Sequence, residues 1–246
     1  MGIFTTIFYQ PIYNLLVFLY DILPFGGVGL AIIILTVIIR AILLPLTWKS
    51  MKSQKDMQEI QPKIREIQTK YKDDKEKMAQ ELMAVYKVHK VNPFASCLPL
   101  LIQLPVFIAL FQALRDGLGE VHGEMLYSFI SNPGTIDAMF LSFIDLSVIS
   151  IPLAILAAIA QYIQVRQTMA RQPQKDVRQE KGAKDENMAA QMSKTMLYVM
   201  PVMSLIIGVT SLPGGVMLYW LSTTIVSILS YYFLFPKKKI EAVIEK

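Results

Sequence analysis

Arg40 is the residue that points most clearly to chemistry, because it stands within a run of apolar and weakly polar residues from 26 to 47. At the centre of a membrane-spanning helix, an arginine costs about 2.5–3.5 kcal/mol on insertion scales. The next charged residue, Lys49, lies nine positions further along, which corresponds to about 13 Å of helical rise. The side chain of Arg40 could therefore reach the aqueous interface at that end only in a strained conformation. The clear apolar segments contain no aspartate or glutamate that could neutralise it. We therefore expect Arg40 to stay charged in a hydrated cavity inside the protein.

Other polar side chains in the apolar segments recur at helical spacing and would line such a cavity. Thr36 and Arg40 are four positions apart, so they share one face of a helix. Taken alone, each such residue is more often one that hydrogen-bonds to a neighbouring helix. Together with an arginine that lacks a partner, they predict a hydrophilic groove. The expected lining is Thr36, Arg40, Gln103, Gln164, Trp220 and Thr223.

The elements that must position these residues are predicted to be membrane-spanning helices. The chain has 246 residues, 54% of them hydrophobic, and the apolar residues form long uninterrupted blocks. A block of about 20 residues is long enough to cross the hydrocarbon core of a bilayer. Four clear blocks and a fifth with polar ends therefore predict five spans. They cover residues 28–47, 94–114, 145–165, 193–211 and 215–235.

The distribution of lysine and arginine predicts the orientation of these spans. Residues 48–92 contain eleven of them, residues 166–194 seven, and residues 236–246 four, whereas residues 1–27 contain none. Segments rich in positive charge stay in the cytoplasm. An even number of spans separates these three segments, which places all of them on one side. The N-terminus is then expected outside and the C-terminus in the cytoplasm.

The predicted fold class is all-α, a polytopic membrane helix bundle with a cytoplasmic helical hairpin and an N-terminal interfacial helix. The hairpin follows from two apolar stripes at helical spacing, separated by a capping-box pattern at residues 73–76. Pro62 should start or kink part of the first hairpin helix. The expected divisions are 1–25 interfacial helix, 26–48 transmembrane helix, 49–92 cytoplasmic hairpin, 93–115 transmembrane helix, 116–143 extracytoplasmic connection, 144–167 transmembrane helix, 168–192 cytoplasmic loop, 193–235 transmembrane hairpin and 236–246 basic cytoplasmic tail.

Several stretches of the chain resemble the YidC/Oxa-type membrane protein insertases, in the order in which that family has them. The most diagnostic stretch is VNPFASCLPLLIQLP at residues 91–105, and the arginine-bearing span is VIIRAILLPLT at residues 37–47. The others are QPKI at 61–64, YVMPV at 198–202 and LPGGVMLYWLS at 212–222. The likeness runs from about residue 25 to residue 235 and is to the short bacterial form, without a large periplasmic domain.

The resemblance implies that the chain inserts nascent membrane proteins and helps them fold, without nucleotide hydrolysis. In that function Arg40 would sit in a groove open to the cytoplasm and to lipid, where it would attract the acidic tail of a substrate. The implied partners are nascent membrane proteins and the lipid bilayer of the bacterial cell membrane, with the ribosome and a Sec translocon as further candidates and no DNA. A monomer should suffice, no cofactor is expected, and the chain should not be an enzyme.

Two other function classes remain open on the residues alone. A transporter could use Arg40 to bind a small anion, but the sequence shows no convincing internal repeat of the kind that transporters have. An intramembrane hydrolase would need a nucleophile with a base, or a set of metal ligands. The single cysteine, Cys97, and the two histidines, His89 and His122, are too far apart in the sequence to predict such a site.

Overall fold

The fold is described from a computed structural model, which defines residues 2–23, 27–92, 98–169 and 184–234. The described chain is largely helical, as the all-α prediction required, with a few two-residue strands in one connection. The expected basic tail at 236–246 lies outside these residues. The helices are the π-helix η1 (Thr5–Tyr9), α1 (Gln10–Ile22), α2 (Gly27–Lys70), α3 (Lys75–Val88), α4 (Leu98–Gly117), α5 (Ile151–Met169), α6 (Lys184–Thr210) and α7 (Gly214–Leu234).

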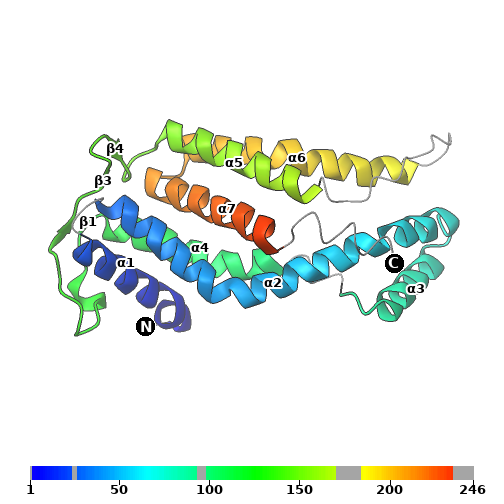
Figure 1. The fold of residues 1–246 in the computed structure, drawn as a ribbon, viewed down its shortest axis with the longest axis horizontal. Coiled ribbons are helices and arrows are strands. Elements are labelled where there is room, and N and C mark those ends of the chain that lie inside the picture. Colours follow the sequence, from blue (N-terminus) through cyan, green and yellow to red (C-terminus); the bar gives the residue numbers. More distant parts are fainter. Residues whose placement is uncertain (1, 24–26, 93–97, 170–183, 235–246) are drawn as a thin grey trace.

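Helix α2 combines an apolar first half with a charged second half in one element of 44 residues. It continues through Pro45 and Pro62, so no new helix starts at Pro62. A proline inside a helix removes one backbone hydrogen bond without necessarily ending the helix. Beyond the bundle, the charged half of α2 extends toward α3, which lies beside it (Figure 1). Lys63 Nζ on α2 is 3.0 Å from His89 Nε2, the residue that follows α3.

The start of α3 differs by one residue from the predicted capping box. Asp74, not Asp73, is the N-cap, and its carboxylate accepts a hydrogen bond from the Lys77 backbone N–H at 3.0 Å. Such a cap satisfies one of the N–H groups that the first helical turn leaves without a partner. The capping-box pattern favours Asp73, which has Glu76 three residues later, whereas Asp74 has Lys77 there and still caps the helix.

The packed core lies where the apolar helices meet (Figure 1). Helix α1 packs against α2 and α4, and α7 packs against α2. Helix α5 packs against both α6 and α7, which are joined by a short turn at residues 211–213. Small residues allow close approach at this turn, since a Cβ added to Gly208 would meet Ala154 Cβ at 2.9 Å and Met217 Cε at 2.8 Å. The arrangement brings α2, α4 and α7 together around one region of the bundle.

The connection between α4 and α5 contains two small antiparallel ladders. Strand β1 (Gly119–Glu120) pairs with β2 (Thr135–Ile136), and β3 (Met139–Phe140) pairs with β4 (Ile144–Asp145). The expected helix from residue 144 therefore begins only at Ile151, because residues 144–145 belong to β4. In the same way, residues 184–192, expected in a loop, belong to α6.

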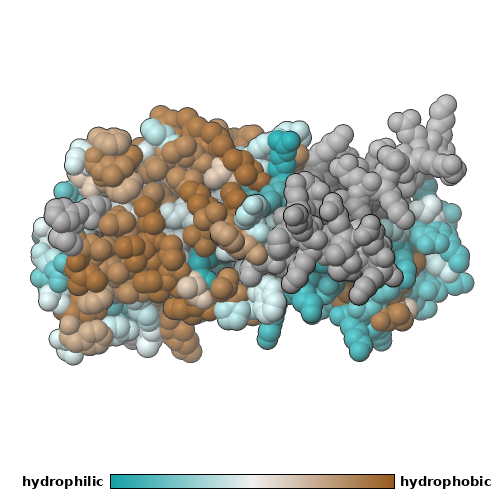
Figure 2. All heavy atoms as spheres, viewed as in Figure 1, coloured by the Kyte–Doolittle hydropathy of each residue, from teal (hydrophilic) through white to brown (hydrophobic). Residues whose placement is uncertain are grey.

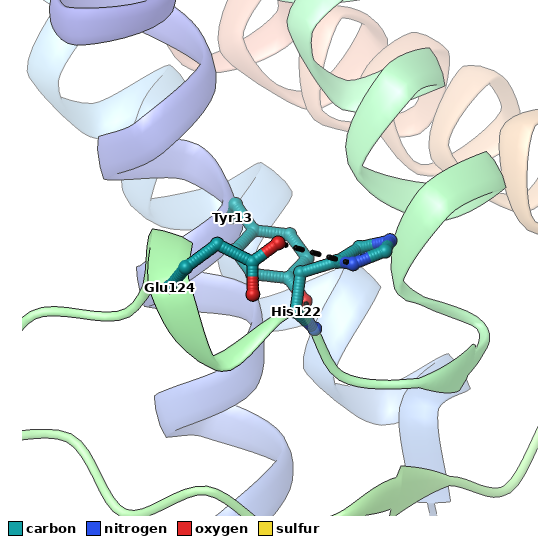
Figure 3. A network of polar contacts seen from close by, with 3 residues as sticks. All are labelled: Tyr13, His122 and Glu124. Atoms are coloured by element: carbon teal, nitrogen blue, oxygen red, sulfur yellow. Dashed lines mark hydrogen bonds and ion pairs between the residues drawn. The ribbon is translucent and has the colours of Figure 1, made fainter.

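Helix α1 is fastened to this connection by side chains from one of its faces. The Tyr13 hydroxyl accepts a hydrogen bond from the His122 backbone N–H at 2.8 Å. His122 precedes the 3-10 helix η3 (Gly123–Met125), and its Nδ1 lies 3.6 Å from Glu124 Oε1 (Figure 3). The Tyr20 hydroxyl accepts a further bond from the Asp137 N–H at 3.0 Å. One end of the bundle is thus covered by α1 and the connection together.

Hydrophobic side chains cover one end of the molecule, and hydrophilic ones gather around the end of α2 and α3 (Figure 2). Among the described residues, α2 and the stretch Gly214–Phe233 are long and apolar enough to cross a bilayer. The stretches Gln103–Arg115 and Leu197–Thr210 are apolar but shorter. The count of five spans stays a prediction.

Candidate functional site

A buried tyrosine, Tyr219, is the centre of a polar cluster among the apolar helices. It lies on the second turn of α7, and only 3% of its surface is exposed. The Gln103 side chain on α4 donates a hydrogen bond from Nε2 to the Tyr219 hydroxyl. A buried phenol hydroxyl needs a partner of this kind, because leaving it without one costs free energy. The contact joins two helices whose residues are 116 positions apart in the sequence.

Arg40 on α2 lies within electrostatic range of Tyr219. The side chains of a helix lean toward its N-terminus. Ile32 of α2 lies near Gly215, one turn before Tyr219, since its Cδ1 would be 3.6 Å from a Cβ added at Gly215. Arg40 is half-buried, and no carboxylate forms an ion pair with it among the side chains that the structure describes. Figure 2 shows a small hydrophilic area between hydrophobic side chains of the apolar half of the molecule.

Two buried polar atoms near this level lack hydrogen-bond partners within the described part of the chain. They are Thr223 Oγ1 on α7 and Gln161 Oε1 on α5. Thr223 lies one turn after Tyr219 and is close enough to interact with its phenol, but no hydrogen bond of ordinary geometry forms. Near the ends of the two helices, Gln167 Nε2 donates to the Ile228 carbonyl at 3.4 Å. Because α5 and α7 run in the same direction, Gln161 and Thr223 lie at similar heights.

The remaining predicted residues are not joined to the cluster by any hydrogen bond between described residues. Thr36 is fully buried and donates its hydroxyl hydrogen to the Ile32 carbonyl of its own helix at 2.7 Å. Trp220 packs edge-on against Phe107, with ring centroids 6.0 Å apart. Gln164 is half-buried on α5, and its backbone carbonyl accepts a hydrogen bond from the Thr168 hydroxyl. The structure therefore brings Arg40, Gln103 and Thr223 together around Tyr219.

Tyr219 was absent from the predicted lining, although it is the residue that connects the others. A weak signal was available, since Tyr219 and Thr223 are four positions apart and share one helix face. The predicted lining contains its neighbour Trp220 instead. Only the packing of α4 against α7 distinguishes the two aromatic residues.

The donors in this cluster suit a polar or negatively charged group. A guanidinium offers five N–H donors and keeps its charge, while a carboxamide and a hydroxyl add neutral hydrogen bonds. A carboxylate entering the cluster would find a cation that no carboxylate of the described residues neutralises. Within the residues described, no group of three or more histidine, cysteine, aspartate or glutamate side chains could hold a metal ion.

Comparisons with known proteins agree on one family. A profile of the family described as "60Kd inner membrane protein" matches residues 18–241. A protein of Fusobacterium nucleatum named membrane protein insertase YidC is 34% identical over 86% of this chain and 88% of its own length. Proteins of the same name from Pelobacter propionicus and Endomicrobium trichonymphae are 36% and 35% identical over 93% of this chain. The match spans only 38% and 39% of those two proteins.

Proposed function

Because the chain belongs to the family of YidC-type membrane protein insertases, we propose that it inserts nascent membrane proteins into the bacterial cell membrane and helps them fold. The clients are membrane proteins during synthesis, and the lipid bilayer receives their spans. The ribosome and a Sec translocon are candidate partners, and one copy of the chain suffices. The protein spans the membrane several times, with its N-terminus outside and its C-terminus in the cytoplasm.

The proposed working site is a hydrophilic groove, open to the cytoplasm and to lipid, with Arg40 as its cation. The observation that carries this proposal is the half-buried Arg40, within electrostatic range of the buried Tyr219, whose hydroxyl accepts a hydrogen bond from Gln103. The proposed lining is completed by four further residues that the sequence predicts, Thr36, Gln164, Trp220 and Thr223. The buried oxygens of Gln161 and Thr223 support a hydrated groove, since water or a substrate amide would satisfy them.

In this mechanism, the polar tail of a client enters the groove first. Its carboxylates are drawn to Arg40, and water in the groove lowers the cost of removing the tail from the cytoplasm. The apolar span of the client then slides between the groove and the lipid. Burial of apolar surface stabilises the inserted state by about 25 cal/mol per Å². The membrane potential adds about 2.3 kcal/mol per charge per 100 mV for an acidic tail that moves outward, so no nucleotide hydrolysis is needed.

The end of the bundle opposite the charged α2 and α3 region is closed in this proposal. Helix α1 and the connection after α4 cover it, and side-chain-to-backbone hydrogen bonds hold the two together. A tail that enters from the cytoplasm would therefore meet a closed outer end. Transfer of the tail would require the client's own span to move into lipid.

Replacement of Arg40 in cells depleted of their own insertase tests the proposal. Arg40→Lys should retain insertion of a client with an acidic tail, Arg40→Ala should reduce it, and Arg40→Glu should reduce it most, because the tail is repelled. Arg166→Ala is a matched control, since it removes a positive charge from an exposed site at the end of α5. Equal insertion by all three Arg40 variants would contradict the electrostatic role of this residue. Failure of the unchanged chain to restore insertion would contradict the function itself.

A further inference from the structure

The turn between β3 and β4 exposes two large apolar side chains at the end of the bundle. Leu141 and Phe143 are 57% and 72% exposed. Hydrophobic side chains also occupy the corner of Figure 2 where Figure 1 places β3 and β4. In water, such a pair on a projecting turn would face solvent on most of its surface. Contiguous apolar surface of this kind marks a contact with a protein or a membrane.

The backbone of this turn is unusual for its sequence. Leu141 and Ser142 both have positive φ angles, of 53° and 66°. The Phe143 N–H donates to the Phe140 carbonyl at 3.3 Å and closes the turn around them. Two consecutive positive φ angles favour asparagine and glycine, and a leucine adopts them at a cost. The turn therefore presents an apolar residue where a polar or small one would fit the backbone better.

The turn is held firmly to the bundle on both sides. The ring of Phe140 lies so close to Gly29 of α2 that a Cβ at Gly29 would meet Phe140 Cδ2 at 2.0 Å. On the other side, the Gly214 N–H donates to the Val148 carbonyl at 2.7 Å, and the Gly215 N–H donates to the Leu146 carbonyl at 2.9 Å. The position of the turn relative to α2 and α7 is thus fixed by packing and by backbone hydrogen bonds.

The exposed apolar surface continues from the turn onto α5. Val148, Ile149 and Ile151 lead from the connection into the helix, and all three are exposed. Ile155 and Ile159 continue the exposed surface along α5. In a membrane protein of this family, exposed apolar residues of a bundle helix face lipid. The turn lies near the end of that lipid-facing surface, and the polar Asp145 and Ser147 lie between the turn and α5 in the sequence.

The height of the turn matches the edge of the hydrocarbon core. Helix α5 has 19 residues, or about 28 Å of rise, against a core of roughly 30 Å. A turn just beyond its first residue therefore lies in the headgroup layer. Side chains anchored there insert about 5–10 Å into the boundary between headgroups and acyl chains. Aromatic residues are enriched in the same layer.

We propose that the β3–β4 turn is a lipid-binding wedge, in which Leu141 and Phe143 insert into the outer leaflet beside α5. The occupant is phospholipid. The apolar surface of the wedge ends at Asp145, a polar residue whose carboxylate accepts hydrogen bonds from the N–H and the hydroxyl of Ser147. Since Phe140 and residues 146–148 hold the turn, the wedge fixes the height and tilt of α2, α5 and α7 in the membrane.

Spin-label accessibility in vesicles tests this proposal without using insertion activity. The full chain with Cys97→Ser carries one nitroxide, attached after Leu141→Cys or Phe143→Cys, in phosphatidylethanolamine and phosphatidylglycerol vesicles. Ile155→Cys on α5 is the lipid control, and Gln80→Cys on α3 is the aqueous control. We expect collisions with oxygen to exceed those with a water-soluble nickel chelate several-fold at 141 and 143, as at 155.

Either position alone decides the outcome. A nickel-chelate accessibility equal to that at position 80 would place the turn in water and overturn the proposal. Low accessibility to both reagents would show a protein contact, such as a second copy, and would also overturn it. Circular dichroism of each labelled variant checks that the helices are retained, and the separate variant labelled at the other position provides an independent reading.

Discussion

The Asn14 side chain on α1 accepts a hydrogen bond from the Tyr127 backbone N–H, with an oxygen-to-nitrogen distance of 2.6 Å. Its Nδ2 donates to the Met125 carbonyl at 2.8 Å, so one carboxamide binds two backbone groups of the connection. The same Nδ2 lies 2.8 Å from the Gln10 carbonyl of its own helix. Asn14 is 1% exposed, so its own side of these part-buried bonds is shielded from water. Asn14 therefore helps to hold α1 against the connection that closes the end of the bundle, together with Tyr13 and Tyr20.

Replacement of Asn14 by leucine should destabilise the protein. The Tyr127 N–H would lose its partner, whereas the Met125 carbonyl would keep the hydrogen bond from Gln10 Nε2 at 3.2 Å. A buried polar group without a partner costs about 1–3 kcal/mol. Thermal unfolding in detergent micelles, followed by circular dichroism, measures the loss. Thr6→Ala is the control, because the Thr6 hydroxyl is exposed and makes only a 3.5 Å contact with the Gly2 carbonyl. An unchanged midpoint for Asn14→Leu would show that α1 is not held by these bonds.

Removal of the Tyr219 hydroxyl should reduce insertion of clients with acidic tails several-fold. In Tyr219→Phe, Gln103 loses its acceptor and Arg40 loses the hydroxyl beside it. Tyr232→Phe is the matched control, since Tyr232 is an exposed tyrosine on the same helix. Complementation of insertase-depleted cells measures the effect, normalised to the amount of variant in the membrane.

A double variant distinguishes a shared site from two separate ones. If Arg40 and Tyr219 act together, then Arg40→Ala with Tyr219→Phe should insert clients no worse than the poorer single variant, because residues in one network are not additive. Multiplication of the two defects would contradict the proposed cluster.

Arg40 could be identified from sequence because a charge in an apolar run is visible without knowledge of the fold. Tyr219 could not, because a tyrosine in an apolar helix is ordinary until Gln103 of another helix is found beside it. Helical spacing placed Thr36 on the expected face of α2, but its hydroxyl bonds back to Ile32. Periodicity indicates which face of a helix a residue occupies, but not which group its side chain hydrogen-bonds.

The helical architecture was predictable for a similar reason, and its details were not. Long apolar blocks indicate helices whatever their neighbours are. The pairing of β3 with β4 rests instead on two-residue strands, which are too short to show any periodicity. No new helix starts at Pro62, because α2 continues through it, and a kink there stays a prediction. The free-energy cost of a proline inside a helix can be offset by the rest of a long helix.

Loss of the N-cap should loosen α3 without affecting the apolar bundle. Asp74→Ala removes the acceptor of the Lys77 N–H and should destabilise the helix by about 1 kcal/mol. Hydrogen exchange of the first turn of α3, measured by mass spectrometry, should become faster. Asp73→Ala changes a neighbouring exposed aspartate that does not cap and should leave the exchange rate unchanged. Equal acceleration by both variants would mean that net charge, and not the cap, controls the helix start.

Replacement of Gly29 by alanine tests whether the close packing of α2 against Phe140 fixes the β3–β4 turn. In most helices, alanine is more stable than glycine by up to about 1 kcal/mol. Here the added Cβ would meet three atoms of the Phe140 ring, the nearest at 2.0 Å, so Gly29→Ala should instead destabilise the protein by about 1–3 kcal/mol. Gly2→Ala is the control, because no atom lies within 4 Å of a Cβ there.

The sign of the effect should reverse when the obstacle is removed. In a Phe140→Ala background, Gly29→Ala has room for its methyl group and should be neutral or stabilising, by helix propensity alone. Unfolding midpoints of the four proteins in this cycle, measured in the same micelles, give the coupling between the two residues. If Gly29→Ala destabilised both backgrounds equally, its effect would come from elsewhere in α2, and the turn would not be positioned by the contact between Phe140 and this helix.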